Sequence, residues 1–119
     1  MTRAVADLVA EPRHAAPLDG AARTGEARGG ERLVVRVGLW LGADGGVARA
    51  AYRATACAAL IAYAEAGCAL AEERGDPSDP ARLRGAVRGV HPIHHDRAEL
   101  VALAFARARG DRLPRGDAA

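Results

Sequence analysis

Three of the chain's four histidines fall within the hexapeptide HPIHHD, at His91, His94 and His95. Imidazole nitrogens and cysteine thiolates are typical ligands of zinc and iron, so Cys57 is the natural thiol to consider beside them. Cys68 lies eleven residues beyond Cys57 in one predicted helix, about 16 Å away along its axis, so the two cysteines cannot share one metal. The alternative is equally simple. The histidines then form a solvated loop, and Cys57 is a small hydrophobic side chain.

The residues that could bind a metal lie where predicted elements meet. From residue 32 the apolar residues recur with period two, which predicts a strand over 32–41, and a second strand follows over 47–56. The intervening GADGG contains the Asp-Gly pair typical of a tight hairpin. Cys57 then stands where the second strand gives way to a helix, and a helix N-terminus favours an anionic thiolate. His94 and His95 stand at the entrance of another helix.

Helix-forming composition and capping residues define the rest of the chain. We predict helices over 57–74, 79–87 and 96–109, and a short helix or arm over 1–10. Asp79 or Ser78 can cap the second of these, with Pro80 at its first position. Asp96 followed by Glu99 fits a capping box for the third. Residues 11–31 are predicted to be loop, residues 110–119 a flexible tail, and Cys68 part of the core.

Composition limits the classes of function. With 119 residues the chain is expected to form a single domain, 1–119, around one core. The seventeen basic residues are all arginine, are scattered along the chain and are nearly balanced by fifteen acids, which argues against a nucleic-acid surface. The chain has no apolar run of membrane-spanning length and only two cysteines, so we expect no membrane association and a cytoplasmic location.

Four segments together resemble the NifU/IscU-type iron-sulfur cluster assembly scaffold over roughly residues 11–109. PRHAAPLDG is similar to that family's Asn-Pro-Arg opening, and TGEARGGERLVV stands where the family has its first Cys-Gly-Asp. ARAAYRATACAALIAYAEA is similar to the strand, Gly-Cys turn and long helix that carry the second cysteine. PIHHDRAELVALAFARA resembles the His-Cys-Ser start of the last helix.

The resemblance implies a ligand set and also shows where this chain departs from it. It implies that Cys57 is the second cluster cysteine, His94 the family histidine and Glu31 the counterpart of the Asp after the first cysteine. Gly29 occupies the position of the first cysteine, and Ala56 replaces the glycine before the second. His95 replaces the third cysteine, which in the family receives sulfur from the desulfurase, and a histidine cannot carry a persulfide.

These observations lead to one expected fold and two main functional hypotheses. We expect an α+β fold, a small antiparallel sheet of about three strands covered on one face by helices. The first hypothesis is a scaffold-like protein, not an enzyme, in which Glu31, Cys57, His94 and His95 bind mononuclear zinc or iron, or an iron-sulfur cluster. By resemblance its partners are a cysteine desulfurase or cluster acceptor proteins. The second is a metal-free relative that serves as a protein-interaction module, and a small zinc hydrolase ranks last.

Overall fold

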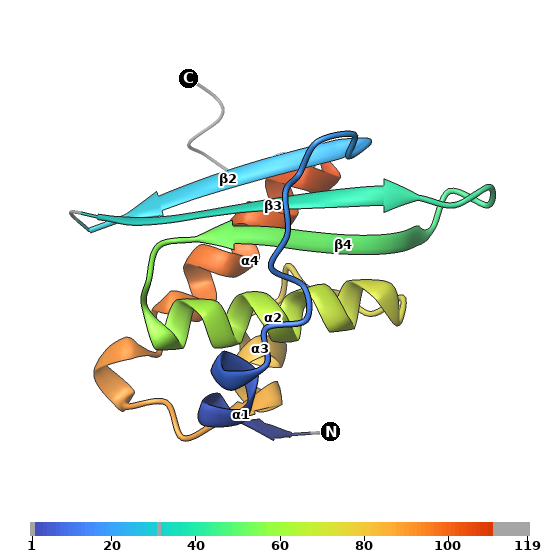
Figure 1. The fold of residues 1–119 in the computed structure, drawn as a ribbon. Helices are drawn as coiled ribbons and strands as arrows, with labels where there is room; N and C mark the ends of the chain where they lie inside the picture. Colours follow the sequence, from blue (N-terminus) through green and yellow to red (C-terminus); the bar gives the residue numbers. More distant parts are fainter. Residues whose placement is uncertain (1, 31, 111–119) are drawn as a thin grey trace.

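The core of the fold is a three-stranded antiparallel sheet with the order β2-β3-β4 (Figure 1). The computed structural model describes residues 2–30 and 32–110. The strands are β2 (Arg23–Gly29), β3 (Leu33–Leu41) and β4 (Val47–Ala54). The period-two pattern of β3 places Val35, Val37 and Leu39 on the helix-covered face, where each is at most 2% exposed. The predicted Asp-Gly hairpin is confirmed, since Asp44 Oδ1 accepts a hydrogen bond from the Gly46 amide at 3.0 Å.

Strand β2 corrects the prediction that residues 11–31 form loop throughout. Its sequence, RTGEARG, lacks the large alternating apolar residues that mark a strand, and only Ala27 is buried. Small residues are required here because helix α4 (Arg97–Arg109) packs directly on the strand at Gly25. Gly25, Ala27 and Gly29 therefore alternate along the helix-facing side of the strand. Their side chains are too small for this alternation to be recognised as a hydrophobic face in the sequence.

Helices cover one face of the sheet, which confirms the predicted α+β fold. Helix α2 (Ala58–Glu72) packs on β4, and α4 packs on β2 and β3. The shorter helices α1 (Val5–Ala10) and α3 (Pro80–Ala86) pack on α2 and on both long helices respectively. Two-residue strands β1 (Arg3–Ala4) and β5 (Val87–Arg88) pair in parallel beside them. None of the helices in the described residues is long and apolar enough to cross a membrane.

Small side chains allow α2 and α4 to approach closely. A Cβ atom on Gly67 of α2 would fall 2.5 Å from Cε2 of Phe105 in α4. Cys68, as predicted, is fully buried in the core. The predicted cap at Asp79 is confirmed as well, because its Oδ1 accepts a hydrogen bond from the Ala81 amide at 3.0 Å. Gly110 ends α4 with a left-handed φ of 79°, and the tail predicted beyond it lies outside the described residues.

The N-terminal segment 11–22, here called the strap, runs from the helix layer around the edge of β4 to the opposite face of the sheet (Figure 1). At that edge the amide of Tyr52 donates to the carbonyl of His14 at 3.0 Å, and the amide of Ala16 donates to the carbonyl of Tyr52 at 3.3 Å. Farther along, Leu18 and Ala21 pack over Gly38 of β3. The strap therefore occupies the outer edge of β4 and part of the face that no helix covers.

Candidate functional site

The three junctions singled out by the sequence lie at one end of the molecule. The β2–β3 turn, the start of α2 and the approach to α4 all occupy the end of the sheet at the left of Figure 1. A cavity of about 620 Å³ lies between the turn and the first two turns of α4. Its lining includes Gly29 and Arg32 from the turn side, and Arg97 and Leu100 from α4. Residues far apart in sequence thus share one surface hollow.

Cys57 occupies the N-cap position of α2. Its backbone is extended, with φ −142° and ψ 118°, and its side chain makes no capping hydrogen bond. The residue is half-buried and packs against the edge of the core, so its sulfur is neither free in solvent nor enclosed in the interior. The guanidinium of Arg97 lies beside it: the pKa of Arg97 is raised, first by the hydrogen bond to Asp96 and also by Cys57. The thiol therefore sits between a helix N-terminus and a fixed positive charge.

His94 and His95 stand directly before α4, at the helix entrance where they were expected. His94 ends the 3₁₀ helix η1 (Pro92–His94), and its ring centroid is 6.3 Å from that of His91. The exposed ring of His95 places Nε2 3.2 Å from the carbonyl oxygen of Val90. His91 Nδ1 accepts a hydrogen bond from the Ile93 amide at 3.2 Å. His91 and His95 are thus both engaged with backbone of their own loop.

The start of α2 and the approach to α4, which carry three of the predicted ligands, lie at the same end of the molecule without bringing those ligands into a closed shell. Across residues 2–30 and 32–110, no three His, Cys, Asp or Glu side chains gather as a metal ion would require. Cys57, His94 and His95 therefore do not converge as a trio in this conformation. Glu31, the fourth predicted ligand, lies outside the described residues. The metal site accordingly stays a prediction.

The predicted capping box at the start of α4 is wrong. Asp96 adopts helical angles, with φ −68° and ψ −15°, and its side chain makes no capping hydrogen bond. Its carboxylate instead accepts a hydrogen bond from Arg97 Nη1 at 2.8 Å, and Glu99 pairs with Arg84 of α3. Asp96 makes a charge-assisted hydrogen bond with Arg97, the next residue, in place of the hydrogen bond that a cap would make. These pairs leave the first turn of α4 lined with charge where it meets the cavity.

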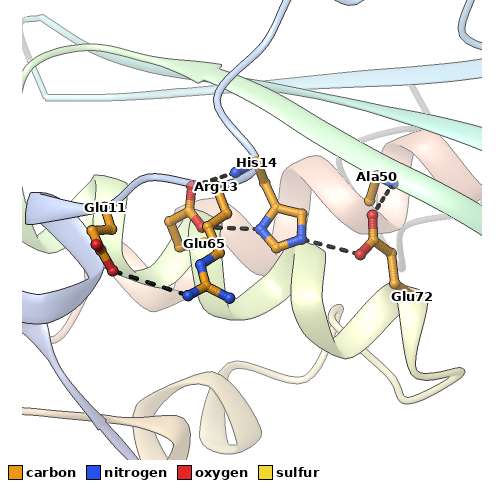
Figure 2. Close-up of polar contacts among 6 residues, drawn as sticks. All are labelled: Glu11, Arg13, His14, Ala50, Glu65 and Glu72. Atoms are coloured by element: carbon orange, nitrogen blue, oxygen red, sulfur yellow. Dashed lines mark hydrogen bonds and ion pairs between the residues drawn. The ribbon is translucent and has the colours of Figure 1, made fainter.

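The most elaborate polar cluster joins the strap to α2, and sequence reasoning missed it (Figure 2). His14 donates its backbone N–H to Glu65 Oε2 at 2.8 Å, and its ring Nδ1 lies 2.9 Å from Glu65 Oε1. Ring Nε2 lies 3.1 Å from Glu72 Oε1, and the other oxygen of Glu72 accepts the Ala50 amide at 2.8 Å. We call His14, Glu65 and Glu72 the His14 clamp.

Burial and charge fix the protonation state of the clamp. The hydrogen bond to Glu65 raises the pKa of His14; burial opposes that shift, and Glu72 adds to it. Burial favours a neutral Glu65, but the ring and backbone hydrogen bonds from His14 outweigh it and hold the pKa of Glu65 below its usual value. A carboxylate only 2% exposed is thereby kept charged. A doubly protonated imidazole donates through both nitrogens, so in that state the His14 ring has no lone pair to offer a metal.

Two signals could have pointed to the clamp. Glu65 and Glu72 are seven residues apart, so they lie on one face of α2, and Glu65 interrupts an otherwise apolar helix beside Ala64. His14 itself sits in an irregular segment whose partners no local pattern predicts. Comparison with known proteins does not supply the missing context, since neither a protein-family model nor a curated protein matches this sequence.

Proposed function

We propose that this protein is a scaffold-like metal carrier that binds iron or zinc, or an iron-sulfur cluster, at the end of the sheet where the three junctions meet. The observation that carries the proposal is one open cavity lined by the β2–β3 turn and the start of α4, with Cys57 beside Arg97, one of its lining residues. Metal ligands held at the ends of rigid elements are well positioned, and an open hollow allows a cargo to be handed to a partner.

The donor chemistry fits this cargo. Cys57 would supply a thiolate, His94 and His95 imidazole nitrogens, and Glu31 a carboxylate, which together suit tetrahedral zinc or ferrous iron. The Nε atom of Arg97 is buried and makes no hydrogen bond within the described residues, and the guanidinium adjoins Cys57. It is well placed to donate to a metal-bound thiolate, as outer hydrogen-bond donors commonly do.

Binding requires a change in the histidine loop. His95 must leave the Val90 carbonyl, and the loop must bring an imidazole to the sulfur of Cys57. The loop carries its own hydrogen bonds and little buried surface, because Ile93 is 69% exposed, so the rearrangement disturbs none of the core. A single thiolate favours a mononuclear ion over a two-iron cluster, which needs more sulfur ligands or a histidine-rich substitute set.

The partners proposed for such a carrier are cytoplasmic proteins of iron-sulfur assembly. A cysteine desulfurase or a cluster acceptor would approach the cavity between the β2–β3 turn and α4. His95, which stands where the resembling family has its sulfur-receiving cysteine, removes direct persulfide transfer to that position. Metal delivery is therefore the favoured role over assembly of a cluster from iron and sulfur.

A second candidate is a metal-free interaction module. It is favoured by the observation that no three His, Cys, Asp or Glu side chains within the described residues are arranged so that they could hold a metal ion. In this version the cavity, with Leu33, Leu100 and Leu103 in its lining, is the functional feature, and it receives a partner side chain. Cys57 then serves only in packing.

Elemental analysis of the purified protein for zinc and iron separates the two candidates. The carrier predicts about one metal ion per chain, lost in Cys57→Ala and reduced in His95→Ala. His91→Ala and Cys68→Ala are matched controls, because each removes the same group at a position outside the proposed ligand set. Metal that stays far below one per chain supports the interaction module, and metal that survives Cys57→Ala contradicts the proposed ligand set. A visible absorption band after anaerobic reconstitution would identify cluster carriage.

A further inference from the structure

The strap is attached to the rest of the fold by few interactions. It is held at the edge by the pairing with Tyr52, on β3 by the Ala22 amide donating to the Leu39 carbonyl at 2.9 Å and by the packing of Leu18 and Ala21 on Gly38. In the helix layer it is held by the backbone N–H and the ring of His14. Arg13, next to it, makes one ion pair with the part of the chain that the structure describes, an exposed pair with Glu11 at 4.0 Å (Figure 2). A pair of that length and exposure contributes little. The attachment of the strap to the helix layer thus depends on His14.

The groups that face His14 come from every element packed around it. From α2 these are the carboxylates of Glu65 and Glu72, with the thiol of Cys68 deeper in the core. From β4 they are the buried phenol of Tyr52, close to Glu65, and Arg49, which lines a small cavity together with His14. The strap itself adds Arg13. Arg49 is held over the Trp40 ring at 4.3 Å, so the two glutamates are the immediate partners of the imidazole.

The interactions of the clamp depend on the protonation state of the His14 ring. With both nitrogens protonated, the ring donates to Glu65 Oε1 and to Glu72 Oε1 and neutralises charge between them. With one proton lost, a bare nitrogen lone pair faces a carboxylate oxygen at about the same distance, so an attraction becomes a repulsion. The backbone bond from His14 to Glu65 carries no titrating proton, so the change begins at the ring.

We propose that His14 is a pH-sensitive clamp that holds the strap on β4 while its ring is doubly protonated and lets the strap detach when the ring loses a proton. Detachment uncovers the outer edge of β4 at Tyr52, whose backbone N–H and C=O then have no partner, and the sheet face at Gly38. Such an edge accepts an added strand. This device is independent of the metal proposed at the other junctions, because none of its groups belongs to that ligand set.

Amide hydrogen exchange followed by NMR between pH 6 and pH 8.5 tests the clamp directly. The reporters are the amides of Tyr52, Ala16 and His14, and Ala64 and Ala104 in the helices report global opening. We compare protection factors, which correct the exchange rates for the intrinsic effect of pH. For each unit by which the pKa of the clamped ring exceeds that of the free ring, the protection factors of the strap reporters are expected to fall about tenfold. The helix reporters are expected to keep their protection over the same range.

Two variants keep the test decisive. His14→Gln cannot titrate, so its strap reporters are expected to show low protection that does not vary with pH. Glu72→Gln removes one carboxylate while leaving a hydrogen-bonding amide, so the midpoint of the loss is expected to move to lower pH. His91→Gln, a histidine outside the clamp, should behave as wild type. Strap protection that is constant with pH in the wild type, or a pH dependence that persists in His14→Gln, would overturn the proposal.

Discussion

Gly25 of β2 lies directly against the backbone of α4, at the carbonyl of Ala104 and the amide of Ala108. A Cβ atom would collide with backbone atoms that cannot rotate away, so the sheet and the helix must move apart. We predict that Gly25→Ala destabilises the fold by about 1–3 kcal/mol in urea unfolding. Gly85→Ala in α3 is the matched control, because its Cβ meets nothing within 4 Å, and it should be neutral or stabilising. Equal effects of both changes would contradict this account of the contact.

Removing the ring of His14 leaves the carboxyl group of Glu65 buried and without its ring partner. We predict that His14→Ala costs about 3 kcal/mol of unfolding free energy, the loss typical of breaking one side of a buried ion pair. Arg13→Ala, one residue away, removes a pair whose side chains are 70% and 74% exposed and should cost under about 0.5 kcal/mol. A similar small loss for both variants would mean that the clamp contributes nothing to global stability.

The clamp also gives stability a definite pH dependence. The folded pKa of His14 is raised above 6.5, so its contribution is complete below pH 6.5 and is lost as pH rises through the raised value. The folded pKa of Glu65 is lowered below 4.5, so its contribution is complete above pH 4.5 and is lost as pH falls through the lowered value. Urea unfolding of the wild type is therefore expected to give its maximum between these limits.

The effect of His14 titration on stability can be separated from that of other groups by the choice of pH range. Burial raises the pKa of Cys68 well above 9.0, so its effect on stability begins only as pH approaches 9.0, where the unfolded thiol ionises. Between pH 6.5 and 8.5 the wild type should lose stability, whereas His14→Gln should change much less. A wild type that gains stability over this range would contradict the assignment.

The two cysteines are expected to differ sharply in reactivity. Cys57 is half-buried, whereas Cys68 is fully buried and its pKa is raised by that burial. A disulfide exchange reagent should therefore titrate one thiol in the native protein and two in denaturant. Cys57→Ser should abolish the native reaction. Rapid modification of two thiols in the native protein would contradict the burial of Cys68.

Sequence reasoning located the elements that carry large alternating or helical apolar patterns. The strand at Val35, Val37 and Leu39 and the helix after Cys57 followed from those patterns, because burial of large side chains leaves a periodic trace. Strand β2 left no such trace, since close approach of α4 selects glycine and alanine there. Of the expected sheet of about three strands, the apolar pattern therefore located only two.

The sequence predicted less of the candidate site than of the fold. Sequence correctly placed Cys57 at the start of a helix and His94 and His95 at the entrance of another, because caps and breakers define such junctions locally. The sequence could not predict the side-chain rotamers, such as the one that places the His95 ring near the Val90 carbonyl. Nor could it predict that Asp96 pairs with Arg97. The His14 clamp joins residues 51 and 58 positions apart, and no local rule relates them.

X-ray absorption spectroscopy at the metal edge of the metal-loaded protein tests the carrier proposal most directly, since it reads the ligand atoms around the ion. The proposal predicts one sulfur at about 2.3 Å and nitrogen or oxygen neighbours at about 2.0–2.1 Å, with the sulfur shell absent in Cys57→Ser. Cys68→Ala should leave the spectrum unchanged. A metal surrounded only by nitrogen and oxygen in the wild type, or a sulfur shell that persists in Cys57→Ser, would contradict the proposed role of the junction end.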